Sequence, residues 1–265
     1  MPYKNDHDDH QNGLQKQNLS KLPRLYLNSK LSADIIIELP PPSAHYLKNV
    51  LRMETGDGLR VFNAKNGEFL ATLDSSSKKN CIVKIGEILR QPTAIKNHIH
   101  LFFPLIKKDR MDFLIEKAVE LGATDLHPIL TQRGNIRDVN CARITSQMIE
   151  ASEQCERMDI PTLHPLLSLN TILSSLHCPM MAAIERGEGV THDLNQALSA
   201  RDFQTHPNIG FMVGPEGGWS EEEREILLNN PLIIPVTLGP RILRVETACL
   251  TCLAAVNIFT APMLT

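Results

Sequence analysis

The spacing of apolar residues changes near residue 95, and this change limits the possible folds more than any other feature of the sequence. Before it, short apolar runs alternate with polar residues and are separated by turns such as Asn66-Gly67, a pattern typical of strands and hairpins. After it, apolar runs of strand length are separated by segments whose apolar residues recur at helical spacing. The sequence therefore predicts two domains, a small strand-rich one and a larger α/β one.

The first part of the chain contains one polar segment and several short strand patterns. Residues 1–22 carry almost no apolar side chains and are predicted to form a flexible tail. Residues 23–92 contain the β-branched run Ile35-Ile36-Ile37, a hairpin pattern over Leu59–Leu73 and a predicted helix at Ser43–Leu51. Several short strands with turns at this spacing predict a small β-barrel.

The second part, residues 98–265, alternates the two kinds of pattern. Strands are predicted at five apolar runs: Ile99–Ile106, Pro128–Leu130, Met180–Ile184, Ile209–Val213 and Leu232–Leu238. Helices are predicted between them, at residues 111–121, Cys141–Arg157, Leu169–Leu176, Asp193–Arg201 and Ser220–Asn229. The uniformly apolar stretch Val245–Phe259 predicts a buried closing helix. This alternation is typical of a parallel α/β sheet whose functional loops follow the carboxyl ends of the strands.

The composition indicates in which cellular compartment the protein is expected. No apolar run approaches the roughly 18 residues of a membrane-spanning helix, and the residues after Met1 lack the apolar stretch of a secretory signal. Six cysteines in a chain of 265 residues, without a dense framework, are typical of free thiols in a reducing compartment. We therefore expect a soluble, cytoplasmic protein with no membrane partner.

The formal net charge of −3 conceals an uneven distribution. Residues 23–97 carry a net charge of +4, whereas residues 98–265 carry −7. One interpretation is a basic module that contacts nucleic-acid phosphates, joined to an acidic enzyme domain. The alternative is a charged surface that serves only solubility.

The stretch Val213–Glu223 follows a predicted strand, contains three glycines and opens a predicted helix. Phosphate-binding loops share this order, but the stretch has neither G-x-x-x-x-G-K-[ST] nor G-x-G-x-x-G, and it contains no basic residue. Ser220 and Glu223 form a capping box, and the carboxylates of the first turn occupy the positive end of the helix dipole. We expect a flat ligand that is uncharged or cationic, such as a nucleoside with a sulfonium. An ordinary tight turn is the alternative.

A second loop, Leu238–Ala248, follows the next predicted strand. In a parallel sheet, two such loops can open on the same edge. Two arginines and a glutamate then lie at the start of the most apolar helix, where an unpaired charge is costly to bury. Either Arg244 and Glu246 pair with each other, or these charges contact a ligand.

Both loops resemble the cofactor loops of the ribosomal RNA small subunit methyltransferase E family, part of the SPOUT superfamily of knotted S-adenosylmethionine-dependent methyltransferases. The chain departs from the family pattern at Glu156, where members commonly carry a small residue before the arginine. The resemblance continues at further segments, among them Arg24-Leu25-Tyr26, His45-Tyr46-Leu47, Glu116–Gly122 and Ala151–Cys155.

The resemblance implies a fold and an activity. The expected fold is a PUA-like RNA-binding β-barrel at residues 23–92, followed by a SPOUT-type α/β domain at 98–265 with a C-terminal trefoil knot. The expected activity is methylation of N3 of one uridine in 16S ribosomal RNA, with S-adenosylmethionine as cofactor. The expected partners are 16S rRNA or the small ribosomal subunit, and a second copy of the chain whose interface lies near the cofactor pocket. The alternatives are a SPOUT enzyme that acts on another RNA, and an inert RNA-binding homologue.

Methyl transfer to uridine N3 requires loss of the imide proton, and a nearby cation would lower the pKa of that imide. We expect Arg244 to be this cation, and Glu246 to orient it or to act as base. The expected cofactor-binding residues are Gly214, Glu216, Gly217, Leu238, Gly239, Ile242 and Leu243. The expected RNA-contacting residues are Arg24, Lys48, Arg52, Arg133 and Arg241.

No metal site is expected. Cys249 and Cys252 form a lone C-x-x-C inside an apolar helix, a pattern typical of core thiols. His98 and His100 share one face of a predicted strand, but no third ligand is expected near them.

Overall fold

The computed structural model describes residues 19–76, 81–95, 97–184, 190, 192–203 and 205–260. The chain divides into two compact units. Unit 1 extends to Ala94 and includes Glu156–Asp159, and unit 2 contains Ile95–Cys155 and the chain from Ile160 onward. Residues 1–18 of the predicted tail lie outside the described residues. No described helix has the length and apolar character needed to cross a membrane.

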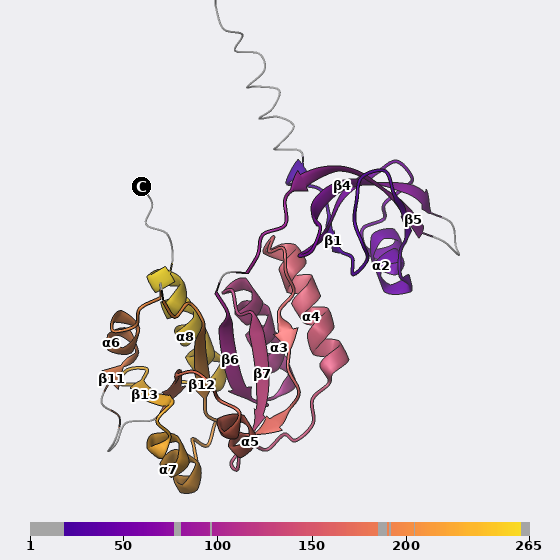
Figure 1. Ribbon diagram of the computed structural model, residues 1–265. Helices are drawn as coiled ribbons and strands as arrows, with labels where there is room; N and C mark the ends of the chain where they lie inside the picture. Colours follow the sequence, from indigo (N-terminus) through magenta and orange to yellow (C-terminus); the bar gives the residue numbers. More distant parts are fainter. Residues whose placement is uncertain are drawn as a thin grey trace, which may run out of the picture. The chain divides into compact units, whose positions relative to one another are not determined.

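Unit 1 is built on a five-stranded sheet with the order β1-β3-β4-β5-β2 (Figure 1). The strands are β1 (Arg24–Tyr26), β2 (Ile36–Glu38), β3 (Gly58–Asn63), β4 (Gly67–Ser76) and β5 (Cys81–Arg90). Among these described strands, β1 and β3 pair in parallel, and the other pairs are antiparallel. The predicted helix is present as α2 (Pro41–His45), continued by the π-helical turn η1 (Tyr46–Val50), from which Leu47 packs into the core.

The predicted hairpin of unit 1 is confirmed. Strands β3 and β4 pair from Gly58–Thr72 to Asn63–Gly67. The side-chain Oδ1 of Asn63 closes the turn by accepting hydrogen bonds from the backbone N–H of Lys65 and of Asn66. Position 67 requires glycine, since its φ is +100° and a Cβ there would lie 2.4 Å from the carbonyl oxygen of Arg90.

Unit 2 contains an all-parallel sheet with the order β11-β13-β10-β12-β6-β7-β8, and β9 also pairs with β7. This topology confirms the predicted parallel α/β class. The strands are β6 (Ile99–Pro104), β7 (Asp125–Leu130), β8 (Thr162–Leu163), β9 (Leu167–Ser168), β10 (Met180–Ala183), β11 (His192–Asp193), β12 (Ile209–Val213) and β13 (Ile233–Thr237).

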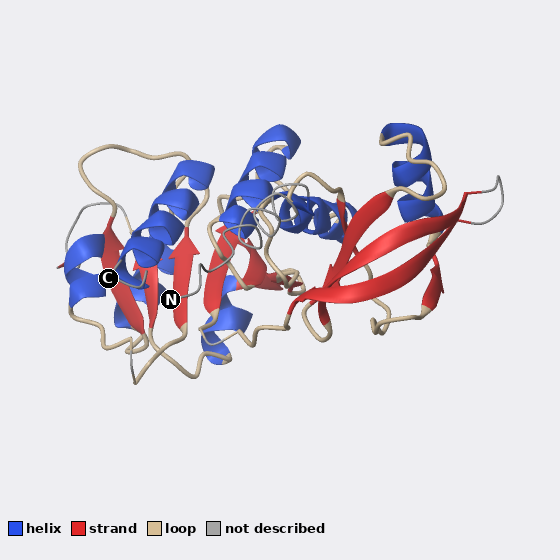
Figure 2. Cartoon of the chain, turned by 90° about the horizontal axis from the view of Figure 1, so that it is seen from above, coloured by secondary structure: helices blue, strands red, loops and turns tan. Residues whose placement is uncertain are grey.

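Helices cover both faces of this sheet (Figure 2). They are α3 (Lys108–Glu120), α4 (Cys141–Gln154), α5 (Leu169–Ser174), α6 (Leu194–Ser199), α7 (Glu221–Asn229) and α8 (Val245–Thr260). Because side chains alternate along a strand, one core forms around Leu101 and Phe211 with α3, α4, α6 and α8. The other core forms around Phe102 and Met212 with α5 and α7.

Several predicted boundaries differ from the structure, and so does the predicted burial of the last helix. Strand β7 begins at Asp125 instead of Pro128, and α4 ends at Gln154 instead of Arg157. Helix α8 is buried on one face only, since the Ile258 side chain is 78% exposed. The apolar run predicted a helix buried all round, but at its carboxyl-terminal end no described element covers the second face.

Candidate functional site

The carboxyl ends of β10, β12 and β13 surround a pocket of about 270 Å³. Strand β10 lies between the other two, so the loops after β12 and β13 face each other across its end. The prediction that both loops open on one edge is confirmed. The lining residues are Ala183, Ile184, Val213, Gly214, Pro215, Gly218, Trp219, Thr237, Leu238, Gly239, Pro240, Arg241, Ile242, Leu243 and Ala248.

Trp219 fixes the glycine-rich loop. Its indole Nε1–H donates a 2.9 Å hydrogen bond to the carbonyl oxygen of Ala183, at the end of β10. A Cβ at position 214 would lie 2.9 Å from the indole ring, closer than real side chains approach. Gly214 is therefore required for the tryptophan to pack against the loop.

The second loop presents backbone to the same pocket. Gly239 has a φ of +108°, in the region that favours glycine, and a Cβ there would meet no atom within 4 Å. Thr237 accepts a hydrogen bond from the backbone N–H of Gly239 through its side-chain oxygen, which holds the turn at the end of β13. Gly239 is one of the residues that line the pocket.

Side chains of the chain itself already form hydrogen bonds at the amino terminus of α7. The capping box between Ser220 and Glu223 is present, as predicted. The buried carboxylate of Glu223 accepts hydrogen bonds from the backbone N–H of Ser220 at 3.0 Å and of Gln132 at 2.7 Å. The exclusion of a phosphate at this helix terminus therefore agrees with the geometry, because carboxylate oxygens already occupy it.

The expected cofactor residues divide into two groups. Five of them line the pocket: Gly214, Leu238, Gly239, Ile242 and Leu243. Glu216 and Gly217 do not line it. Glu216 pairs with Arg110, and the carbonyl oxygen of Gly217 accepts a 3.0 Å hydrogen bond from Arg133.

Arg110, on α3, connects the two loops. Its guanidinium pairs with Glu216 of the first loop and lies 3.8 Å from the carboxylate of Glu246, in the first turn of α8. Glu246 is buried, and its Oε2 has no hydrogen-bond partner among the described residues. Sequence reasoning missed Arg110, because no local pattern shows that α3 reaches both loops.

Arg244 is exposed and forms no ion pair with any residue that the structure describes. The expected contact in which Glu246 orients Arg244 is therefore not formed; Glu246 faces Arg110 instead. Arg241 is also exposed and lines the pocket. Arg241 is therefore available to a ligand in the pocket, and Arg244 is exposed directly after the lining residue Leu243.

Arg24 does not fit its expected role as a phosphate contact. Its side chain is 2% exposed and donates a 2.5 Å hydrogen bond to Glu68, while its guanidinium lies 3.6 Å from the centre of the Phe62 ring. Arg60 and Arg90 pair with the same glutamate. Arg24 therefore belongs to the buried charge network of unit 1.

The other basic residues predicted to contact RNA differ in how exposed they are and in what they bind. Arg52 is exposed, and Lys48 is half-buried on η1. Arg133 donates hydrogen bonds from Nη1 to the carbonyl oxygens of Gly217 and Trp219, so it holds the glycine-rich loop.

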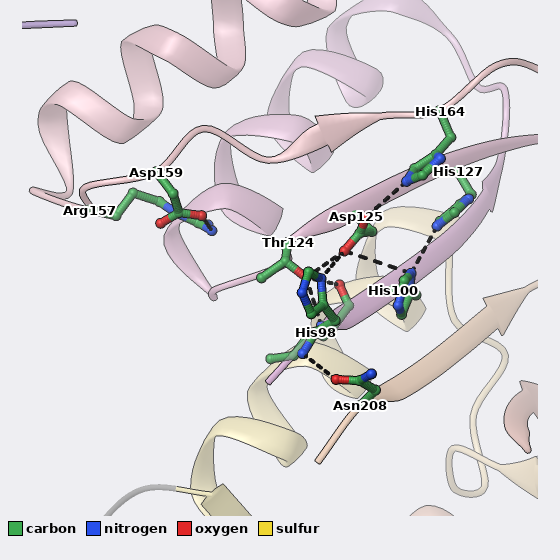
Figure 3. Close-up of polar contacts among 10 residues, drawn as sticks. His98, His100, Thr124, Asp125, His127, Arg157, Asp159, His164 and Asn208 are labelled. Carbon is green, nitrogen blue, oxygen red and sulfur yellow. Dashed lines mark hydrogen bonds and ion pairs between the residues drawn. The ribbon is translucent and has the colours of Figure 1, made fainter. Parts of the chain in front are cut away.

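The expectation that His98 and His100 lack a third ligand is wrong. The Oδ2 of Asp125 lies 2.9 Å from the Nδ1 of His98 and 3.8 Å from the Nδ1 of His100 (Figure 3). The signal was the D-x-H at the start of β7, which places Asp125 and His127 on one face. It was missed because the strand was expected to begin only at Pro128.

Comparisons with known proteins match both units. A model described as an RNA methyltransferase domain matches residues 93–257, and one described as an RNA methyltransferase PUA domain matches residues 39–86. The ribosomal RNA small subunit methyltransferase E of Rickettsia conorii is 35% identical over 239 residues, which cover 90% of this chain and 96% of the relative.

Two further relatives agree. The protein of the same name from Buchnera aphidicola (subspecies Schizaphis graminum) is 28% identical over 247 residues, 90% of this chain and 96% of the relative. The crystal structure of the Neisseria gonorrhoeae protein of that name, bound to S-adenosyl methionine, is 30% identical with a TM-score of 0.76. It matches over 89% of this chain and 97% of its own.

Proposed function

The chain belongs to the ribosomal RNA small subunit methyltransferase E family, and we propose on this basis that it methylates N3 of a uridine in 16S ribosomal RNA with S-adenosylmethionine as methyl donor. The observation that carries the proposal is the pocket in which both family loops meet. The match of residues 39–86 to a PUA domain supports unit 1 as the RNA-binding part.

The pocket suits a nucleoside better than a polyphosphate. Its lining consists of apolar side chains and backbone, and Arg241 is the one charged residue among those described there. The open space beside Gly239 lets a ligand approach the backbone closely. The nearby helix terminus, capped by Glu223, offers no seat for phosphate.

The residues that would hold the cofactor are the five expected ones that line the pocket, together with Trp219 and Thr237. When bound, S-adenosylmethionine supplies a methyl group on a sulfonium, which a nitrogen anion can accept. Glu216 and Gly217 would act indirectly, through Arg110 and Arg133, by keeping the first loop in place. They are positioning residues in this proposal.

The reaction also needs the N3–H proton of uridine to leave. Arg244 is exposed beside the pocket loop and forms no ion pair among the described residues, so its guanidinium is free to stabilise the uridine anion. Glu246 is buried, and its Oε2 lies 3.8 Å from Arg110 without a hydrogen-bond partner among the described residues, so it can accept a proton or a hydrogen bond from a ligand. Arg241, Lys48 and Arg52 would contact RNA.

Several finer expectations are part of the same proposal. We propose that unit 1 is a closed β-barrel, that the chain through α8 forms a trefoil knot, and that two copies form a dimer in the cytoplasm. Helix α8 leaves the β13 end of the sheet and packs against β12, β6 and α3, as such a crossing requires. Ile242 and Ile258, 89% and 78% exposed, are apolar surface that a second copy would cover.

The deciding experiment is mass spectrometry of ribosomal RNA from cells with and without this protein. We expect one 3-methyluridine in 16S rRNA to be absent from cells that lack the protein and to be restored when the wild-type gene is returned. Purified protein with labelled S-adenosylmethionine should restore it on small subunits from the deficient cells. An unchanged methylation pattern in 16S rRNA would reject the proposed substrate. A methyl group missing from another RNA would identify that RNA as the substrate instead.

A further inference from the structure

Five side chains that bind metals in other proteins meet at the amino-terminal edge of the unit 2 sheet (Figure 3). Strands β6, β7 and β8 are neighbours, and in their parallel register His100 lies opposite Asp125. The pocket described above lies at the carboxyl ends of the strands, which is the opposite edge. The cluster is therefore separate from the proposed methyl-transfer site. Its members are His98, His100, Asp125, His127 and His164.

The carboxylate of Asp125 is at the centre of the cluster. Its Oδ2 lies 2.9 Å from His98 Nδ1 and 3.8 Å from His100 Nδ1, and its Oδ1 lies 2.8 Å from His164 Nε2. The fifth side chain, His127, contacts His100: its Nε2 lies 3.1 Å from His100 Nδ1.

Two groups of three ligands share this carboxylate. In one group, Asp125 joins His98 and His100; in the other, it joins His127 and His164. Within each group, all ligand atoms lie within 4.8 Å of one another. Ligands at about 2.0–2.2 Å from a zinc ion are separated by about 3.4 Å in a tetrahedral site. Side-chain movements of up to about 1 Å would close either group around one ion.

The surroundings hold these side chains in orientation. Thr124 donates a 2.8 Å hydrogen bond from Oγ1 to Asp125 Oδ2. The ring of His127 stacks between Phe102, at a centroid distance of 4.0 Å, and His164, at 3.8 Å. Metal sites commonly have such outer contacts, because they fix the direction of the ligand lone pairs.

We propose that this cluster binds one divalent transition-metal ion of the kind that prefers imidazole, such as Zn²⁺, with Asp125 as the central ligand. Imidazole nitrogens favour zinc, nickel or copper over magnesium and calcium, which prefer oxygen ligands. One carboxylate supports one dication, since a second ion at this spacing would be repelled by the first. The side chains of His98 and His164 are 45% and 33% exposed, so an ion can enter from solvent.

An ion here would tie the amino-terminal halves of β6 and β7 to His164, the residue that follows β8. It would therefore stabilise unit 2, because it binds the folded arrangement and not the unfolded chain. This role is independent of the methyltransferase activity, and so is its test.

The test uses the full chain purified without a polyhistidine tag and stripped with a chelator. In calorimetry, we expect Zn²⁺ to bind with one ion per chain and a dissociation constant in the micromolar range or below, and Mg²⁺ not to bind. Co²⁺ should give visible absorption bands without the charge-transfer band of thiolate ligands. Zn²⁺ should also raise the melting temperature.

Variants locate the ion. Because both groups share the carboxylate, Asp125→Asn should weaken Zn²⁺ binding at least tenfold and remove the thermal shift. At least one of two double variants, His98→Asn with His100→Asn or His127→Asn with His164→Asn, should do the same. His177→Asn with His206→Asn, which changes two histidines outside the cluster, is the matched control and should bind as wild type.

Among the described residues, the exposed thiols Cys141, Cys155 and Cys178 are competing zinc ligands. The triple serine variant should retain binding if the proposal is correct. Loss of binding in that variant would overturn the proposal, as would wild-type binding in Asp125→Asn or no saturable Zn²⁺ binding by the wild-type chain. If Asp125→Asn fails to fold, the two double histidine variants and the triple serine variant still show whether Zn²⁺ binds to the cluster or to the exposed thiols.

Discussion

At the scale of residues, the charges of unit 1 are organised around one glutamate. Glu68 is fully buried and contacts three arginines: Arg24, Arg60 and Arg90. Arg60 also pairs with Glu156 at 2.9 Å, and the hydrogen bond from Arg60 lowers the pKa of that glutamate. Glu156, at which the chain departs from the family pattern, therefore accepts a hydrogen bond from one of the arginines that surround Glu68.

We predict that Glu68→Ala destabilises unit 1 by about 3–5 kcal/mol, because it leaves buried guanidinium groups without their carboxylate. Burial already lowers the pKa of Arg24, and Glu68 opposes that effect. Chemical denaturation of the full chain measures the loss. Glu87→Ala, which removes an exposed carboxylate from β5, is the control and should change stability by less than about 0.5 kcal/mol. Equal stability of the two variants would contradict the prediction.

A second prediction at this scale concerns Arg244. Arg244→Ala should lower the turnover number of methyl transfer by about 100- to 1,000-fold, because one charge-stabilising group is lost. Affinity for S-adenosylmethionine should stay within about twofold, and Arg244→Lys should restore part of the rate. Single-turnover assays and calorimetry measure the two quantities. Arg137→Ala, at an exposed arginine outside the pocket, is the control. Near-normal turnover of Arg244→Ala would remove Arg244 from this role.

At the scale of elements, the pocket depends on how three strand ends are joined. Trp219 links the loop after β12 to the end of β10, and Arg110 links that loop to α8. Neither link lies within one element. The loop conformations therefore depend on the neighbouring strands and helices being in place.

Gly214→Ala should weaken S-adenosylmethionine binding by about 5- to 150-fold, since a Cβ there overlaps the indole and overpacking costs about 1–3 kcal/mol. Trp219 is the single tryptophan of the chain, so its fluorescence reports directly on the pocket. Gly58→Ala is the matched control, because its Cβ would make ordinary contact with Leu22 at 3.5 Å. Unaltered affinity and fluorescence in Gly214→Ala would show that the loop can adjust.

Helix α8 supports another prediction. Burial raises the pKa of Cys252 to about 12 and that of Cys249 well above its ordinary value, so neither thiol ionises near neutral pH. In the native protein we expect a thiol reagent at pH 8 to modify Cys141, Cys155 and Cys178, which are exposed, and to spare Cys81, Cys249 and Cys252. Peptide mass spectrometry identifies the modified sites, and all six should react after denaturation. Rapid native labelling of Cys252 would contradict the burial of this face.

At the scale of the whole molecule, the two units divide the proposed work. Unit 1 contains the exposed basic candidate Arg52 and the half-buried Lys48, and unit 2 contains the pocket. The net charge of +4 over residues 23–97, against −7 over 98–265, fits this division.

Lys48→Ala combined with Arg52→Ala should lower RNA affinity and reduce the slope of log affinity against log salt by about one to two units, one for each phosphate that the variant no longer neutralises. Binding of S-adenosylmethionine in the other unit should not change. The control replaces Lys30 and Lys65, two exposed lysines of the same unit, with alanine. An unchanged salt slope in the first pair would exclude these residues from the RNA interface.

Local patterns in the sequence were sufficient for the parallel α/β class of unit 2 and for the pocket loops. The period of the apolar residues distinguishes strand from helix, and the capping box at Ser220 marks the start of α7 without any tertiary information. The motifs after β12 and β13 located the pocket, because all carboxyl ends of a parallel sheet lie on one edge.

The contacts between separate elements were decided by the tertiary structure, above all by the order of the strands. It is not encoded in local periodicity, because residues far apart along the chain become neighbours only when particular strands pair. The burial of Arg24 against Glu68, the bridge from Arg110 to both loops and the meeting of His98 with Asp125 all arise in this way. Each depends on an ionic or polar contact across separate elements, and such contacts form only after the apolar cores have brought those elements together.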